Sequence, residues 1–173
     1  GNLSETYGAV IILEDDLVVS PSFYHYTYAA VNHYAAEARV AGVSLYSHGW
    51  NGYANLEFTP VKNEYDCYFG QYSITWGQCW TSDQWGRFKK WYLAHEDQLP
   101  SDNVAMPSGI SRWSAQSWGK YYISHMVEND LYYVIPYQAM TTNFTDIGQH
   151  NSIADTSHQV VLQQGCVSQF RFP

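Results

Sequence analysis

Hydrophobic residues form one continuous run near the start of the chain and then recur at helical spacing. The run 8–13 has the length of a strand, and unbroken apolar runs are typical of α/β strands that are covered on both faces. Ser20 and Pro21 predict an N-cap followed by proline in the first turn of a helix, which continues at helical spacing as far as Gly42. A second strand is predicted over 42–47. This order predicts a βαβ unit with parallel pairing and a right-handed crossover.

Aromatic residues dominate the hydrophobic pattern in the middle of the chain. Their roughly helical intervals predict a helix within 75–92, with Thr81 or Ser82 as the candidate cap. The flanking segments 49–72 and 96–109 combine glycine, asparagine, proline and charged residues, and they predict loops.

The last predicted elements are a helix, a strand and a candidate fourth strand. Apolar residues at helical spacing predict a helix over 115–129, and the short apolar run 131–136 predicts a strand. The segment 137–144 is a candidate fourth strand, whereas the polar tail after Gly148 has no clear pattern. We therefore predict a single domain over 1–173 of the α/β class, with a sheet flanked by helices.

Composition excludes several classes of protein. With 46% hydrophobic and 14% charged residues, the chain is not an intrinsically disordered segment. A net charge of −8 repels nucleic acid and anionic membranes, so neither is an expected partner. No apolar run approaches the roughly 18 residues of a transmembrane helix. Sixteen Tyr and seven Trp suit core packing first and the stacking of sugars or bases second.

The cysteines indicate a reducing compartment. Cys67, Cys79 and Cys166 are odd in number and form no CxxC pair, so neither a disulfide framework nor a zinc knuckle is expected. We expect a cytoplasmic protein, with any peripheral contact with a membrane left to regions outside this chain.

Three consecutive carboxylates end the first predicted strand. Glu14, Asp15 and Asp16 lie at its carboxyl end, where open α/β sheets bind ligands. Three like charges repel one another unless a cation neutralises them, and carboxylate oxygens suit Mg²⁺ or Mn²⁺, which also bind phosphate. Alternatively, Asp15 or Asp16 simply ends the strand and caps the next turn. The triplet by itself leaves both interpretations open.

Three segments carry a resemblance to a known family. The stretch "VIILEDDLVVSPSFYHY" resembles the metal-binding segment of GT-A-fold glycosyltransferases, whose DxD-type motif here is Glu-Asp-Asp. It is similar in particular to relatives of the Golgi N-acetylglucosaminyltransferase that begins complex N-glycans, and to bacterial family 2-like transferases. The segment 117–151 is similar to the family's C-terminal pattern, and "FGQYSITWGQCW" to its acceptor-side segment. The resemblance implies a Rossmann-like mixed sheet flanked by helices.

The resemblance also implies roles for particular residues. Asp16 would ligate a Mn²⁺ or Mg²⁺ ion that bridges the diphosphate of a nucleotide-sugar donor, while Asp15 and Glu14 would face the ribose and the transferred sugar. His150 would lie near the diphosphate or the metal. Tryptophans would line the pocket for the sugar or the glycan acceptor, although core packing suits them equally well: Trp76, Trp80 and Trp118.

The chain departs from the family at the catalytic base. Inverting relatives carry an aspartate after the tryptophan of the late helix, and Gly119 occupies that position here. Since glycine cannot accept a proton from the acceptor hydroxyl, either another carboxylate substitutes, or the stereochemistry differs, or the chain is not a competent catalyst. The nearest carboxylates in sequence to the acceptor segments are the candidate bases: Asp83, Glu96, Asp97 and Asp102.

A second departure concerns the nucleotide-binding half. Family members carry it before the Glu-Asp-Asp strand, whereas only 13 residues precede Glu14 here. The chain therefore resembles the C-terminal portion of a GT-A domain, with the N-terminal half of the same polypeptide as an implied partner. We expect the isolated chain to bind the donor weakly or not at all.

The expected activity is the metal-dependent transfer of a sugar from a nucleotide-diphosphate donor to a glycan or another hydroxyl acceptor. The alternatives are a carbohydrate-binding module and a non-catalytic fragment of such an enzyme. A glycoside hydrolase is less well supported, because its two carboxylates flank the sugar, whereas adjacent Asp15 and Asp16 point to different faces of a strand.

Overall fold

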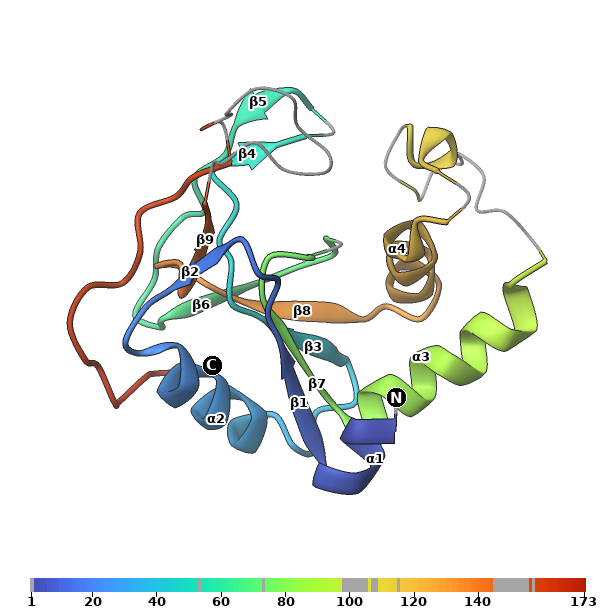
Figure 1. The fold of residues 1–173 in the computed structure, drawn as a ribbon, viewed down its shortest axis with the longest axis horizontal. Coiled ribbons are helices and arrows are strands. Elements are labelled where there is room, and N and C mark those ends of the chain that lie inside the picture. Colours follow the sequence, from blue (N-terminus) through green and yellow to red (C-terminus); the bar gives the residue numbers. More distant parts are fainter. Residues whose placement is uncertain are drawn as a thin grey trace.

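The computed structural model describes residues 2–52, 54–72, 74–97, 106, 109–114, 116–144, 156 and 158–173. Over these residues the protein is an α/β structure with helices on a central sheet (Figure 1). The helices are α1 (Asn2–Tyr7), α2 (Phe23–His33), α3 (Ser82–His95), α4 (Trp118–Glu128) and the short 3-10 helix η1 (Ile110–Arg112). The strands are β1 (Ala9–Ile12), β2 (Leu17–Val19), β3 (Val40–Ser44), β4 (Trp50–Asn51), β5 (Leu56–Glu57), β6 (Cys67–Gly70), β7 (Gln78–Thr81), β8 (Tyr132–Pro136) and β9 (Thr141–Asn143).

The central sheet is mixed, and its order differs from the predicted βαβ unit. In the described part of the chain its order is β1-β7-β3-β8-β6, in which only β3 and β8 pair in parallel. Strands β1 and β3 run in the same direction but do not pair, because β7 lies antiparallel between them. Cys79 is opposite Ile11 on one side and Val43 on the other. The prediction of a parallel β1–β3 pair is therefore wrong.

Strand β1 is at the edge of this sheet, which corrects a second expectation. Its first three residues are half-buried and Ile12 is exposed, so this apolar run is not covered on both faces. The position of a strand in a sheet depends on its partners, and the run of apolar residues alone does not specify them.

The helix predicted within 75–92 is confirmed as α3, and the residues just before it form a strand that the sequence analysis did not predict. Residues 78–81 form β7, and α3 begins at Ser82. Thr81 is the N-cap, as one of the two predicted candidates: its hydroxyl accepts the N–H of Gln84 at 3.2 Å, and the Gln84 side chain accepts the N–H of Thr81 at 2.9 Å. Trp76 and Trp80 are four residues apart, a helical interval, although both precede α3.

Helix α2 is confirmed, but with different ends. Its N-cap is Ser22, so Pro21 precedes the helix instead of occupying its first turn. The Ser20 hydroxyl accepts the N–H of Ser22 at 3.1 Å and donates to the Gln163 carbonyl at 2.7 Å. The helix ends at His33, before the predicted stop.

Short strands account for the remaining differences. The predicted loop 49–72 contains the β4–β5 hairpin and β6, whose two to four residues are too few to show a period. The predicted strand over 131–136 and helix over 115–129 are confirmed as β8 and α4. The candidate fourth strand over 137–144 is present as β9, although it pairs with β2 and not with the central sheet.

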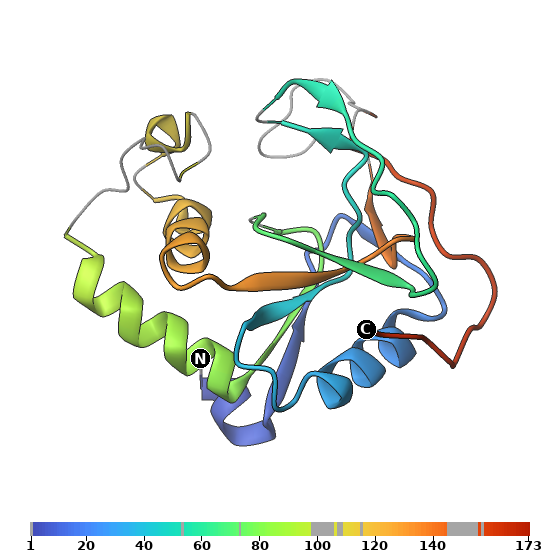
Figure 2. The same cartoon turned by 180° about the vertical axis from the view of Figure 1, so that it is seen from behind.

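The sheet has a hydrophobic core on each face. Side chains of β3, β7 and β8 alternate between the two faces, and α3 and α4 cover one face while α2 covers the other (Figure 2). On the first face the rings of Trp80 and Tyr122 stack with centroids 5.3 Å apart. On the second, Phe170 of the C-terminal segment contacts Tyr26 at 5.3 Å. Much of the high aromatic content is therefore core.

Histidine 125 makes stability depend on pH. Its side chain lies on α4 between Phe88 and Trp91, and burial, followed by the charges of Arg87 and His95, lowers its pKa from 6.5 to about 4. Between these two pH values, His125 binds a proton in the unfolded chain but not in the folded protein. The contribution of His125 to the free energy of unfolding is therefore fully present above pH 6.5, and it is lost as the pH falls toward 4.

We expect His125 to account for about 2 kcal/mol of the stability lost between pH 7.5 and pH 5. Urea denaturation at both pH values, compared between the wild type and a His125→Gln variant, measures this part of the pH dependence. A His25→Gln variant, altered at an exposed position on α2, should keep the wild-type dependence. An unchanged pH dependence in His125→Gln would contradict the assignment.

Candidate functional site

The carboxyl ends of three strands meet at one edge of the sheet. Strands β1, β3 and β8 run in the same direction, as their pairing with β7 and with each other requires. The triplet Glu14 to Asp16 follows β1, His48 lies shortly after β3, and β9 follows β8. This edge is where open α/β sheets bind ligands.

The three carboxylates form an exposed turn, which we call the acid turn (Glu14, Asp15 and Asp16), between β1 and β2. The backbone carbonyl of Asp16 accepts the N–H of Phe144, and this bond joins the turn to the end of β9. Asn143 of β9 is opposite Leu17, and its side-chain oxygen is buried without a hydrogen-bond partner among the described residues. The acid turn is thus held beside the C-terminal segment that the sequence analysis linked to it.

A pocket of about 240 Å³, the inner pocket, lies next to the acid turn. Half of its described lining residues are aromatic, and one is a carboxylate. Its lining residues are Ile12, Glu14, Thr75, Gln78, Trp80, Trp85, Phe88 and Trp118.

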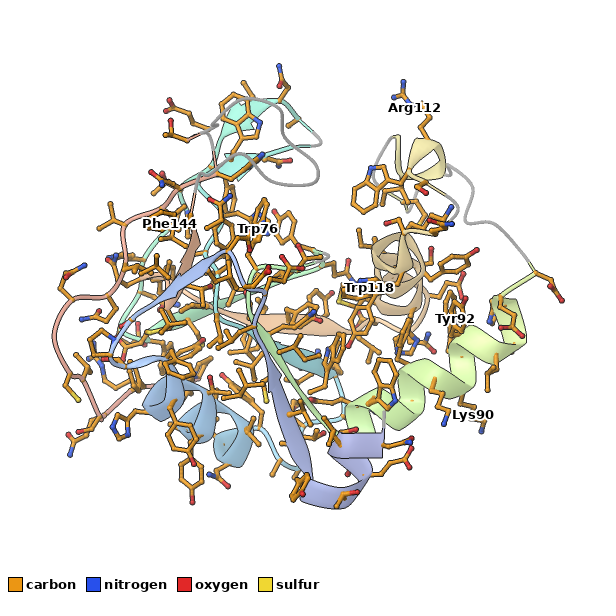
Figure 3. All side chains as sticks on the ribbon, in the orientation of Figure 1. Trp76, Lys90, Tyr92, Arg112, Trp118 and Phe144 are labelled. Atoms are coloured by element: carbon orange, nitrogen blue, oxygen red, sulfur yellow. The ribbon has the colours of Figure 1, made fainter. Side chains whose placement is uncertain are left out.

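A larger depression of about 520 Å³, the aromatic cleft, adjoins the inner pocket, since Thr75 and Trp118 line both. Figure 3 shows Trp118 on α4, with Trp76 farther across the molecule on the side of β9. The residues that line the aromatic cleft are Tyr46, His48, Trp50, Gly52, Tyr72, Thr75, Trp76, Gly109, Arg112, Trp113, Ser117, Trp118, Gly119 and His158.

The structure brings together most of the residues that the sequence analysis assigned to the substrate. Glu14, Trp80 and Trp118 line the inner pocket, and Trp76 lines the aromatic cleft. Trp76 contacts the rings of Tyr46 and His158, each with centroids 4.9 Å apart. Asp15 and Asp16 lie on the adjoining acid turn but are not among the residues that line either pocket. His150 falls outside the described residues, so its role stays a prediction.

The three candidate bases that the structure describes line neither pocket. Asp83 is exposed in the first turn of α3 and pairs with Arg87 at 3.0 Å. Because Thr81 is opposite Ala9 at the start of β1, this end of α3 is at the other end of the strand from the acid turn. Glu96 and Asp97 are exposed just after α3.

Asp102 lies outside the described residues. Gly119, at the family's catalytic position, is buried and lines the aromatic cleft. The identity of the base therefore stays a prediction.

His48 is a residue that the sequence analysis missed. Its ring contacts those of Tyr46 and Tyr72, each with centroids 5.0 Å apart, and its Nε2 atom is buried without a hydrogen-bond partner in the described residues. Burial, followed by the charge of His158, lowers the pKa of His48 to about 4, so the imidazole is neutral at pH 7. The rule that drew attention to Glu14, a polar residue just after a strand of the same direction, also identifies His48.

The oxygen donors at the acid turn suit a magnesium or manganese ion that a substrate helps to hold. No group of three or more His, Cys, Asp or Glu side chains in the described residues is arranged to hold a metal unaided. An ion that bridges a diphosphate needs only one or two carboxylates, because phosphates and water complete its coordination. Asp15 and Asp16, both exposed on the acid turn, offer such donors.

Comparison with known proteins leaves the family unassigned. No protein-family model matches the chain, and no curated protein matches it.

Within the part of the chain described by the structure, no helix has the length and apolar character of a membrane span. The three cysteines are free, with Cys67 and Cys79 buried and Cys166 exposed. The fold is of the α/β class, with a five-stranded mixed sheet in the described residues.

Proposed function

We propose that the protein is a GT-A-type glycosyltransferase that moves a sugar from a nucleotide-diphosphate donor to a glycan acceptor, with a divalent cation bound at the acid turn. The observation that carries this proposal is the position of the acid turn. It follows β1 at the ligand-binding edge of the sheet, and its Glu14 opens onto an aromatic pocket.

The two adjoining pockets support an order of substrates along this edge. The diphosphate would lie at Asp15 and Asp16, the transferred sugar in the inner pocket beside Glu14, and the acceptor in the aromatic cleft. Thr75 and Trp118 line both pockets and therefore mark the boundary at which the two sugars would meet.

The chain's own residues suit transfer between two sugars. Asp16, with Asp15, would hold the cation, and a bound divalent cation supplies charge neutralisation for the departing diphosphate. Trp80 and Trp118 would exclude water from the sugar. Among the described lining residues, the groups that can accept a proton from an acceptor hydroxyl are Glu14, His48 and His158.

A carbohydrate-binding role without transfer is the second candidate. The larger of the two pockets favours it, because the aromatic cleft has no carboxylate among its described lining residues. Such a protein would bind sugars without a nucleotide or a metal, and the cation experiment below separates the two candidates.

An Asp16→Asn variant should bind Mn²⁺ together with uridine or guanosine diphosphate at least about tenfold more weakly than the wild type, because the amide removes the negative charge that holds the cation. The paramagnetic resonance of free Mn²⁺, followed while the protein is added, measures this binding even when it is weak. In a transfer assay the same variant should lose its metal-dependent turnover.

A Glu64→Gln variant is the matched control, since it removes an exposed carboxylate that lines neither pocket and should change nothing. Equal binding by the Asp16→Asn variant and the wild type would refute the site. Binding of free sugars without any binding of Mn²⁺ and a nucleoside diphosphate would favour the carbohydrate-binding role.

A further inference from the structure

The aromatic cleft differs in charge from the rest of the protein. The chain carries a net charge of −8, yet the described residues that line the cleft include an arginine and two histidines and no carboxylate. Arg112 carries the positive charge among these groups, since His48 is neutral at pH 7. A cavity of this kind favours a ligand that carries negative charge.

Arg112 is held at the cleft by its own 3-10 helix. The N-cap of η1 is Gly109, with φ at +87°, and a Cβ atom at Gly109 would lie 3.0 Å from Nη2 of Arg112. The guanidinium therefore lies over the Gly109 backbone, at a residue that also lines the cleft. Figure 3 shows Arg112 at η1, on the same side of the molecule as Trp118.

Arg112 also differs from the other arginines in its pairing. Arg39, Arg87 and Arg171 each lie within 4.0 Å of a carboxylate oxygen. Arg112 forms no ion pair with any residue that the structure describes. Its planar guanidinium remains available for two parallel hydrogen bonds to a carboxylate or a phosphate.

The walls of the cleft suit a saccharide. Trp113 is exposed beside Arg112, and Trp76 and Trp118 supply further ring surface. The faces of such aromatic rings pack against the C–H faces of sugars, while the hydroxyl groups of the sugar remain free for hydrogen bonds. At about 520 Å³ the cleft lies within the range of small-ligand sites.

We propose that the aromatic cleft binds an acidic saccharide, in which a sugar ring packs on the tryptophans and its carboxylate pairs with Arg112. The inference rests on the proposed function in one respect, because it takes the cleft as the acceptor side of the transferase. It narrows the acceptor class from any glycan to one that carries a carboxylate at or near the accepting sugar.

The test compares an oligogalacturonide with a neutral galactose oligomer of the same length, titrated into the full chain and followed by tryptophan fluorescence. The wild type should bind the acidic oligomer about two- to fivefold more tightly than the neutral one, the gain expected of a solvent-exposed charged pair. Arg112→Gln should remove this preference and leave the affinity for the neutral oligomer unchanged.

Two further variants locate the binding site. Trp113→Ala, altered at an exposed ring of the cleft, should weaken the binding of both oligomers. Arg39→Gln, altered at an exposed arginine that pairs with Glu37, should weaken neither.

Equal affinity for the two oligomers, no binding of either, an unchanged preference in Arg112→Gln, or unchanged binding in Trp113→Ala would each overturn the inference. So would Arg112-dependent binding of uridine diphosphate at the cleft, which would assign Arg112 to the donor. Equal binding of Mn²⁺ and nucleotide by Asp16→Asn and the wild type, with the acidic preference intact, would refute the proposed metal site and leave the ligand of the cleft standing.

Discussion

A Gly42→Ala variant should lose about 3 kcal/mol or more of its free energy of unfolding, the upper range for overpacking a rigid core. A Cβ atom at Gly42 would lie 2.6 Å from a ring carbon of Tyr133, and 2.7 and 2.9 Å from two ring atoms of Trp80. Neither ring has room to move, because Tyr133 is fully buried and Trp80 nearly so. Urea denaturation at pH 7.5 measures the loss.

Gly86→Ala is the matched control for this substitution. Gly86 lies inside α3, and a Cβ atom there would meet nothing within 4 Å. Alanine should stabilise the protein by roughly 0.5 to 1 kcal/mol, because it removes the conformational freedom of glycine from a helix. If Gly42→Ala were as stable as the wild type, the close approach of Trp80 and Tyr133 to β3 would be wrong.

A Tyr133→Phe variant should lose about 2 to 4 kcal/mol, since it leaves two buried polar groups without partners. The Tyr133 hydroxyl accepts the indole N–H of Trp80 at 2.8 Å and donates to the side-chain oxygen of Gln78 at 2.9 Å. Both neighbours are buried, so water cannot replace the lost bonds. Urea denaturation measures the loss of stability, and near-ultraviolet circular dichroism reports the freedom gained by Trp80.

Tyr137→Phe removes a comparable hydroxyl from a solvent-exposed hydrogen bond, in which Tyr137 donates to the Val61 carbonyl at 2.8 Å. Its expected cost is below about 1 kcal/mol, because water can satisfy the carbonyl. Equal costs for the two variants would show that the Tyr133 network is not closed to solvent.

These two predictions also concern the proposed site. Gln78 and Trp80 both line the inner pocket, and the hydroxyl of Tyr133 on β8 forms hydrogen bonds with both side chains. A pocket wall that is fixed by buried hydrogen bonds needs little reorganisation to bind a sugar. Stability and ligand binding should therefore weaken together in Tyr133→Phe, whereas Arg112→Gln should affect ligand binding alone.

Local patterns were sufficient for several elements. Helices α2 and α4 and strand β8 lie where periodicity and apolar runs predicted them. The triplet Glu14 to Asp16 and Trp118 were identified from their sequence context, and the structure places Glu14 and Trp118 at one pocket. These features depend on residues that are close in sequence, for which spacing and flanking turn residues are informative.

Other features depended on distant partners. Residues 75–81 carry tryptophans at helical spacing, yet 78–81 form a strand because this segment pairs with β1 and β3 at once. The same pairing separates the two strands that the sequence suggested as neighbours. Such pairing is decided by burial across the whole sheet and overrides local propensity.

The sequence alone determined the α/β class, the acidic triplet at the end of the first strand and the aromatic character of the candidate site. Only the tertiary structure placed His48 and Arg112 in one cleft with Trp76, and only it separated Asp83 from the acid turn. The physical reason is that a motif acts through neighbouring atoms of one segment, whereas a pocket is formed by side chains whose segments meet only when the sheet assembles.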